Sequence, residues 1–237
     1  ICFSQRNSRR QSGIGGGWHN WNDMTELIPA ILAKDEATFR SRLAIAEMLA
    51  SIVQLDIMDG HFVPNATWYD PAALKTIKTN ARYELHLMVS DPTAYIGASE
   101  HMTNIARIIW HIEVAIAHDV LINWCHTMGI EAGIAISPET PIGRLDPFVA
   151  DLDEILVLGV HPGFSGQALQ PHTREKVKDV RVRWPNVVVG FDGGVNVESI
   201  RELRDAGVTR FCVASAIFQA QNPKKAFKEL SAILESL

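Results

Sequence analysis

The stretch Gln54-Leu55-Asp56-Ile57-Met58-Asp59-Gly60-His61-Phe62-Val63-Pro64-Asn65 decides how the rest of the chain is interpreted. Its alternation predicts a β-strand with Gln54, Asp56 and Met58 on one face, and Asp59-Gly60 predicts a loop directly after it. A carboxylate at the end of an apolar strand is costly to bury without a partner and usually has a task. We therefore expect the chain to bring other polar strand ends to Asp56.

Length and composition place the chain among ordinary globular proteins. Its 237 residues, 47% hydrophobic and 21% charged, suit one eight-stranded α/β barrel or two small domains. A net charge of −5 gives no reason to expect nucleic acid as a partner, and no apolar run reaches the roughly eighteen residues of a membrane span. The cysteines lack metal-type spacing, so we expect reduced thiols in a cytoplasmic protein at Cys2, Cys125 and Cys212.

Residues 1–23 differ from everything that follows. They contain several arginines, a glycine run at 15–17 and no acidic residue before Asp23. We expect a disordered tail, either a cloning appendage or sequence upstream of a natural start at Met24. An organellar transit peptide is the weaker alternative because no clear amphipathic stripe is present. Residues 24–237 are then expected to form a single domain.

Short apolar runs alternate with longer helical patterns from Leu27 onward. The apolar runs predict strands at 27–32, 52–58, 82–88, 105–111, 131–136, 153–160, 187–191 and 209–214. The segments between them predict helices at 36–49, 71–78, 92–100, 114–128, 141–149, 168–183, 197–206 and 223–236. Eight such alternations fit a closed (β/α)8 TIM barrel better than an open doubly wound sheet. The open sheet is the alternative, but the turn at Leu32-Ala33-Lys34-Asp35 lacks the glycine-rich dinucleotide fingerprint.

Polar side chains gather at the predicted carboxyl ends of the strands, where barrels of this kind do their chemistry. Strand alternation points Asp56, His86 and Asp192 into the mouth of the barrel. Two carboxylates and an imidazole suit a divalent metal site or an acid/base pair. Each residue alone is as often structural, whereas three on separate strands favour function. Further candidates for a pocket at the strand ends are Met58, Met88, His111 and His161.

Small residues gather in the loops after the last three predicted strands. These loops contain 161–167, 192–196 and 214–216. Small residues let backbone N–H groups approach an anion closely, and the loops after strands seven and eight of such barrels often hold a phosphate. The glycines could serve only tight turns, but their presence in adjacent loops favours a phosphate site.

Five motifs resemble those of the ribulose-phosphate 3-epimerase family, in the family's order. They are Asp56–Asn65, His86–Val89, Pro162–Phe164, Asp192–Gly194 and Ser215–Phe218. The resemblance runs from about residue 28 to the C-terminus and implies a barrel of the ribulose-phosphate-binding type. The family interconverts D-ribulose 5-phosphate and D-xylulose 5-phosphate by moving the proton at C3 through an enediolate.

The resemblance also implies roles for individual residues. Asp56 and Asp192 would be the acid/base carboxylates and, with His86, would bind one divalent metal ion that stabilises the enediolate. Met58 and Met88 would lie under the substrate, a ketose phosphate. Because the family commonly forms dimers or larger assemblies, we expect a homo-oligomer. The implied phosphate-binding residues are Gly163, Phe164, Ser165, Gly166, Gly193, Gly194, Ala214 and Ser215.

Several positions depart from the family's pattern. Gln54 stands where the family has a histidine as its fourth metal ligand. Its neutral amide oxygen would lower the affinity for the metal and shift the preference from zinc or iron toward manganese or magnesium. The identity of the metal, which could also be cobalt, is therefore left open. His111 or His161 could supply a replacement nitrogen. Ala30 replaces a serine that approaches the substrate. Glycines or a methionine of the family are replaced at Ser165, Ala214 and Leu158.

The predicted function is an active epimerase with an altered metal site, acting on ribulose 5-phosphate or a related, for example six-carbon, ketose phosphate. A phosphosugar lyase or decarboxylase is a second hypothesis, but the Asp56 and Asp192 pair suits two-faced proton transfer and no catalytic lysine lies near the strand-two motif. A binding protein that has lost catalysis would explain Gln54 and Ala30. It would not require both carboxylates.

Overall fold

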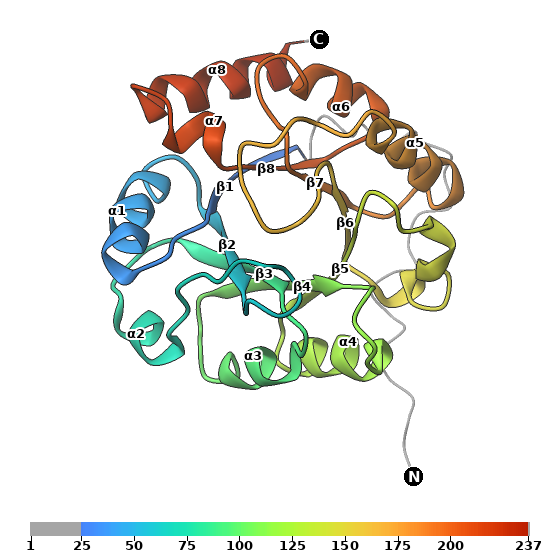
Figure 1. Ribbon diagram of the computed structural model, residues 1–237, viewed down its shortest axis with the longest axis horizontal. Helices are drawn as coiled ribbons and strands as arrows, with labels where there is room; N and C mark the ends of the chain where they lie inside the picture. The colour runs from blue at the N-terminus through green and yellow to red at the C-terminus, as the bar shows by residue number, and fades with distance from the viewer. Residues whose placement is uncertain (1–24, 237) are drawn as a thin grey trace, which may run out of the picture.

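The computed structural model describes residues 25–236, in which eight parallel strands close into a barrel (Figure 1). The strands are β1 Glu26–Ile31, β2 Ile52–Met58, β3 Arg82–Met88, β4 Ile105–His111, β5 Glu131–Ile136, β6 Glu154–Leu158, β7 Val189–Asp192 and β8 Arg210–Val213. Each strand pairs with the next in the chain, and β8 pairs with β1. The barrel predicted from the sequence is confirmed, while the predicted tail lies outside the described residues.

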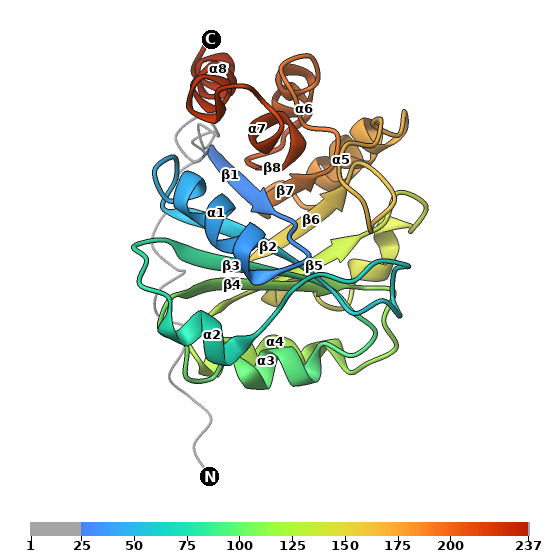
Figure 2. The same cartoon turned by 60° about the vertical axis from the view of Figure 1, so that its left-hand side comes forward.

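Helices cover the outside of the barrel, as Figure 2 shows. They are α1 Glu36–Ala46, α2 Pro71–Thr76, α3 Thr93–Ala98, α4 His118–Thr127, α5 Thr173–Arg183, α6 Ile200–Ala206, α7 Ser215–Phe218 and α8 Pro223–Glu235. Several begin at residues with a local capping role: Asp35 accepts a 2.7 Å hydrogen bond from Thr38 N, and Asp70 and Asn222 cap α2 and α8 ahead of prolines. In residues 25–236, no helix has the length and apolar character needed to cross a bilayer.

The predicted helix at 141–149 is wrong. That segment forms two 3₁₀ turns, η2 Ile142–Leu145 and η3 Val149–Asp151. Pro147 lies between them. Proline has no N–H to donate and clashes with the carbonyl four residues earlier, so it strongly disfavours a regular α-helix through this position. The short helix α7 was not predicted because its four residues are too few to show a helical period.

Two apolar layers surround and fill the barrel. The larger one packs the outward-facing strand residues, such as Leu55, Leu85 and Ile108, against the helices. A smaller cluster fills the interior and consists of Ile28, Ala30, Ile109, Ala135, Leu156, Leu158 and Cys212. The interior is therefore packed, and a ligand can approach only from an end of the barrel.

Charged side chains fill the barrel toward the amino ends of its strands. Arg107 Nε lies 2.8 Å from Glu131 and 3.2 Å from Glu154, and Arg107 also pairs with Glu84. Arg210 lies 2.6 Å from Glu154 and 3.0 Å from Glu26. Burial and the neighbouring Glu154 raise the pKa of Glu84 to about 7, although the charge of Arg107 opposes that shift. We call these six residues the floor cluster.

Candidate active site

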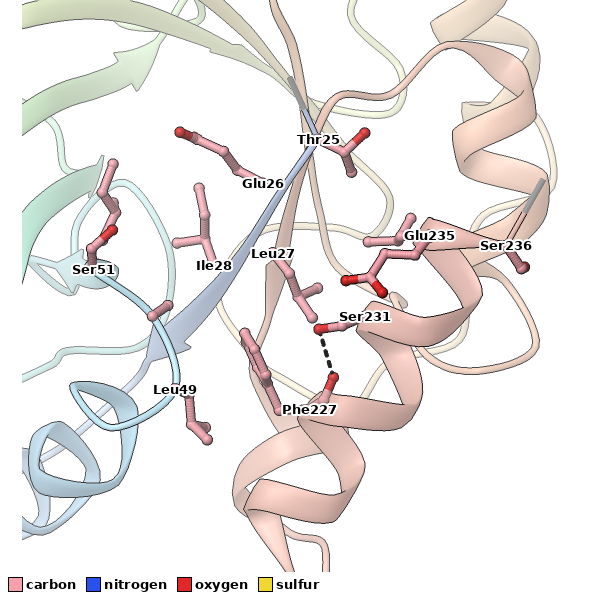
Figure 3. A pocket seen from close by; sticks show the side chains of 13 residues that line it. Thr25, Glu26, Leu27, Ile28, Leu49, Ser51, Phe227, Ser231, Glu235 and Ser236 are labelled. Atoms are coloured by element: carbon pink, nitrogen blue, oxygen red, sulfur yellow. Dashed lines mark hydrogen bonds between the residues drawn. The ribbon is translucent and has the colours of Figure 1, made fainter. Parts of the chain in front are cut away.

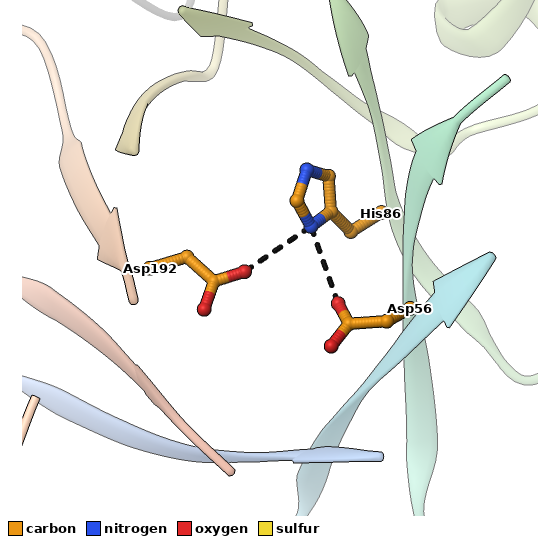
Figure 4. A group of neighbouring side chains, drawn as sticks. All are labelled: Asp56, His86 and Asp192. Atoms are coloured by element: carbon orange, nitrogen blue, oxygen red, sulfur yellow. Dashed lines mark hydrogen bonds and ion pairs between the residues drawn. The ribbon is translucent and has the colours of Figure 1, made fainter. Parts of the chain in front are cut away.

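Three polar side chains meet at the carboxyl ends of β2, β3 and β7 (Figure 4). Asp56, His86 and Asp192 each present one ligand atom, and these atoms lie within 4.8 Å of one another. Asp56 and His86 are register partners on neighbouring strands, and closure of the barrel brings Asp192 to them. His86 Nδ1 lies 3.2 Å from Asp56 Oδ1 and 3.2 Å from Asp192 Oδ2. The structure thus brings together the three residues that strand alternation pointed into the mouth of the barrel.

The side-chain amide of Gln54 completes this group. Its Nε2 donates hydrogen bonds of 2.8 Å to Asp56 Oδ1 and 2.9 Å to Asp192 Oδ2. Its Oε1 is buried and has no hydrogen-bond partner among residues 25–236. Gln54 and His86 therefore face the same two carboxylate oxygens.

The geometry and charge of these four side chains fit a divalent metal ion. Neighbouring atoms around the group are separated by 2.8, 2.9, 3.2 and 3.2 Å. A metal with ligands at about 2.0–2.1 Å would hold adjacent ligand atoms roughly 2.9–3.4 Å apart. Asp56, His86 and Asp192 supply two oxygens and a nitrogen as they stand. Gln54 would have to turn its amide by half a turn to present oxygen.

The protonation of the site shows its need for positive charge. Burial and the charge of Asp192 raise the pKa of Asp56. Burial would lower the pKa of His86, but hydrogen bonds to Asp192 and Asp56 and their charges together raise it to about 10. The two carboxylates therefore favour a positive charge beside them, which a bound divalent cation would supply.

A second histidine lies behind His86, away from the carboxylates. His111 Nε2 is 3.1 Å from His86 Nε2, and His111 Nδ1 is 3.2 Å from Glu113 Oε2. Burial lowers the pKa of His111. Burial would raise the pKa of Glu113, but hydrogen bonds from His111 and Thr140 and other interactions lower it to about 2. Glu113 was missed, although the spacing of His111 and Glu113 at a strand end was the signal that could have revealed it.

A pocket opens above the carboxylates, and most of the predicted site residues line it. Met58 and Met88 contribute to its wall beside Asp56, His86 and Asp192. The loops after β6, β7 and β8 also line it. These loops contribute all the predicted phosphate-binding residues to the pocket, namely Gly163, Phe164, Ser165, Gly166, Gly193, Gly194, Ala214 and Ser215.

Two residues predicted for the substrate pocket lie elsewhere, and a third, His161, lines it from the rim. Ala30 is completely buried in the apolar interior of the barrel, and His111 lies behind His86. His161 is on the rim, where its ring is 57% exposed and its Nε2 lies 3.4 Å from Glu139. Neither histidine belongs to the group of metal-binding atoms. His111 Nδ1 lies beside Glu113 instead, and His161 lies beside Glu139.

The backbone of the loop after β7 requires glycine. Gly193 and Gly194 have φ angles of +96° and +73°, which residues with a Cβ rarely adopt. A Cβ on Gly193 would lie 2.5 Å from Val160 Cγ2. By contrast, Ala214 has a φ of −103°, so the alanine that replaces a family glycine brings no such conflict. The short helix α7 begins at Ser215, where barrels of this kind frequently place the helix of a phosphate site.

Asp59 ties the loop after β2 to its surroundings. Its Oδ1 accepts hydrogen bonds from the backbone N–H groups of His61 and Phe62, and its Oδ2 accepts two from Ser90. Asn65, at the end of the same loop, donates a 2.8 Å hydrogen bond to Gly163 O in the loop after β6. Much of the long strand-two motif therefore shapes the rim of the pocket.

A hollow of about 670 Å³ lies at the opposite end of the barrel (Figure 3). It is lined by the start of β1, the approach to β2 and the helix α8, and includes Glu26, Phe227 and Glu235. It is larger than the pocket above Asp56, but residues 25–236 place no cluster of metal-binding atoms in it. Because chemistry in such barrels belongs to the carboxyl ends of the strands, we assign the active site to the smaller pocket.

Comparisons with known proteins identify the family of the chain. The model of the ribulose-phosphate 3 epimerase family matches residues 26–218. The ribulose-phosphate 3-epimerase of Escherichia coli K12 is 34% identical over 86% of this chain and 93% of its own length. That of Schizosaccharomyces pombe is 32% identical over 86% of this chain and 92% of its own length.

Solved structures share the fold at low identity. Mycobacterium tuberculosis tryptophan synthase has a TM-score of 0.68 at 14% identity, covering 91% of this chain and 95% of that one. A 3-hexulose-6-phosphate synthase has a TM-score of 0.62 at 17% identity, covering 88% and 99%. These likenesses concern the barrel alone. The family match and the similarity to curated epimerases show that the chain belongs to the ribulose-phosphate 3-epimerase family.

Proposed function

We propose that this chain interconverts D-ribulose 5-phosphate and D-xylulose 5-phosphate by moving the proton at C3. The observation that carries the proposal is the pair of carboxylates from β2 and β7, Asp56 and Asp192, meeting at the base of one pocket. Epimerisation needs a proton to leave one face of the carbon and return to the other. Two acid/base groups on separate strands of the barrel meet that need.

The electrostatics of Asp56 and Asp192 support acid/base roles on the two faces of C3. Two-faced transfer requires one carboxylate to start ionised and the other protonated. Burial and the charge of Asp192 raise the pKa of Asp56, which favours one proton on the pair. Asp56 then removes or returns the proton on one face of C3, and Asp192 does so on the other.

Loss of the C3 proton leaves negative charge on an enediolate. A divalent metal held by Asp56, His86 and Asp192 would stabilise that charge when bound. We propose Gln54 Oε1 as a weak fourth ligand, with a preference for manganese or magnesium over zinc or iron, because an amide oxygen is harder and less basic than an imidazole nitrogen.

The rest of the pocket suits a phosphorylated sugar. The N–H groups of the loops at 163–166 and 193–194 and the start of α7 would bind the phosphate. Met58 and Met88 would pack under the carbon chain. We also propose that the protein forms a homo-oligomer, which size-exclusion chromatography with light scattering would test.

Proton exchange into heavy water tests the activity directly. Purified protein, supplied with Mn²⁺, Zn²⁺ or Fe²⁺ in turn, is expected to exchange the C3 proton of ribulose 5-phosphate and to form xylulose 5-phosphate. A six-carbon ketose phosphate tests the length of the sugar. If no metal gave C3 exchange from either substrate, the proposal would be wrong, and ligand binding unaffected by a chelator would point to a binding protein.

A further inference from the structure

A buried line of hydrogen bonds runs from the carboxylates through His86 and His111 to Glu113. We propose that His111 and Glu113 are positioning residues, which fix the tautomer of His86 so that Nδ1 offers its lone pair to the metal. The inference rests on the proposed metal-assisted function. It deepens that function by assigning roles to two residues outside the pocket.

The line begins at Glu113, whose carboxylate can only accept hydrogen bonds. Its Oε1 accepts from Ser137 N at 3.0 Å and from Thr140 Oγ1. Its Oε2 is left for His111 Nδ1, 3.2 Å away. His111 Nδ1 must therefore carry a proton.

The orientation of the next bond follows. Two imidazole nitrogens 3.1 Å apart, His111 Nε2 and His86 Nε2, form a hydrogen bond only if one carries a proton and the other does not. A neutral His111 protonated on Nδ1 has a bare Nε2, so His86 Nε2 donates. His86 Nδ1, which faces both carboxylates, is then the nitrogen left to bind a metal.

The surroundings of the two rings make this line hard to replace with water. Both histidine side chains are fully buried. Their rings are stacked at 5.2 Å with an interplanar angle of 20°, and the Phe62 ring lies 4.7 Å from that of His111. Glu113 is thus the group that sets the direction of the line.

Glu113→Gln is the informative variant. Ser137 N and Thr140 Oγ1 both donate, so they would hold the amide oxygen and turn the NH₂ group toward His111 Nδ1. His111 would then have to carry its proton on Nε2, which reverses the bond to His86 and moves the His86 proton to Nδ1. We expect the affinity for Co²⁺, measured by titration calorimetry without substrate, to fall about 10–100-fold, as losses of such supporting residues typically do.

The matched control is Glu139→Gln, which makes the same change at an exposed glutamate that also pairs with a histidine, His161, at 3.4 Å. Its Co²⁺ affinity is expected to equal that of the unmodified protein. Equal Co²⁺ affinity of Glu113→Gln and the control would overturn the proposal.

Nitrogen NMR of the unmodified, metal-free protein gives a second test that does not depend on how the variants fold. Labelled ring nitrogens should show His111 protonated on Nδ1 and bare on Nε2; the opposite tautomer would overturn the proposal. If this tautomer and the loss of Co²⁺ affinity are both found but no ketose phosphate exchanges its C3 proton, the epimerase function fails while the positioning role stands.

Discussion

Gln54 joins the two carboxylates through its Nε2, whereas its Oε1, which has no hydrogen-bond partner among residues 25–236, is the atom that a metal would use. Replacement by histidine should therefore raise the affinity for zinc, because an imidazole nitrogen suits that metal better than an amide oxygen. Gln54→Leu, of similar size and without a ligand atom, should bind manganese more weakly than the unmodified protein. Competition with a fluorescent chelator measures both, and unchanged affinities in both variants would place Gln54 outside the metal shell.

Asp56 and Asp192 should separate proton exchange from epimerisation. In Asp192→Asn, epimerisation should fall about 10²–10⁴-fold, because one face of C3 has lost its acid/base group. Asp56 could still remove and return the proton on its own face, so one epimer should exchange with heavy water without inverting. Asp56→Asn should reverse which epimer exchanges. NMR of each pure epimer with each variant measures this, and exchange of both epimers by both variants would contradict the assignment.

The residues of the site were predictable to the extent that alternation along a strand determines which way each side chain points. Asp56, His86 and Asp192 follow from that rule and from the motifs. The pairing of His111 with His86 could not be predicted in this way, because a side chain at the end of a strand can face a neighbouring histidine as easily as the pocket. His161 lies just beyond its strand, where alternation no longer determines which way a side chain points.

At the scale of elements, Asp59 should hold the loop after β2 in place. Removing its four hydrogen bonds in Asp59→Ala should lower the free energy of unfolding by about 1–3 kcal/mol at pH 7. These bonds hold the pKa of Asp59 well below its usual value of 3.8, outweighing the opposing effect of burial. Its contribution is thus present above that value and is lost as the pH falls below it. Urea unfolding should show a smaller difference in the free energy of unfolding between Asp59→Ala and the unmodified protein near pH 3 than at pH 7. An equal difference at the two pH values would show that ionised Asp59 does not hold the loop in place.

The loop after β7 should tolerate no side chain at Gly193. Gly193→Ala combines a φ of +96° with a Cβ 2.5 Å from Val160, so we expect a loss of about 1–3 kcal/mol and a higher KM for the sugar phosphate. Ala214→Gly is the matched comparison, since Ala214 has an ordinary φ and the change restores the family's residue. Thermal unfolding and steady-state kinetics measure both. Equal losses would show that the shape of this loop does not depend on glycine.

Element boundaries were predictable where a local signal marks them. Asp70 before Pro71 and Asn222 before Pro223 start helices at the expected residues. The helix predicted at 141–149 is wrong because the apolar spacing there resembles that of a helix, whereas Pro147 disfavours a regular α-helix. Helix α7 follows β8 directly and is shorter than any periodic signal.

At the scale of the whole molecule, barrel closure was predictable from repetition but the floor cluster was not. Eight strand and helix units specify the architecture without fixing which inward residues meet. Glu84, Arg107, Glu154 and Arg210 come from four different strands, and only closure and strand register bring them together. Each one, taken from the sequence alone, resembles an ordinary charged residue near the start of a strand.

Arg107 should be the main support of this cluster. It is 1% exposed and pairs with Glu84 and Glu154, both fully buried, so Arg107→Met would leave buried carboxylates with less positive charge. Breaking a buried pair in this way destabilises a protein by about 3–5 kcal/mol, which for a chain of this size corresponds to a fall of roughly 6–20 °C in Tm.

The pH dependence of that loss provides the sharper test. Burial already raises the pKa of Glu84 to about 7, and removal of Arg107 should raise it further. A carboxyl group whose pKa is raised by folding stabilises the protein below its unfolded value and loses that contribution as the pH rises through its folded value. The deficit of Arg107→Met should therefore be smaller at pH 5 than at pH 8. Arg174→Met, which removes an exposed arginine paired with Glu202, should change stability by less than about 1 kcal/mol at either pH. Calorimetric melting at the two pH values measures both variants, and equal Tm shifts in the two would show that the floor cluster contributes no more than a surface ion pair.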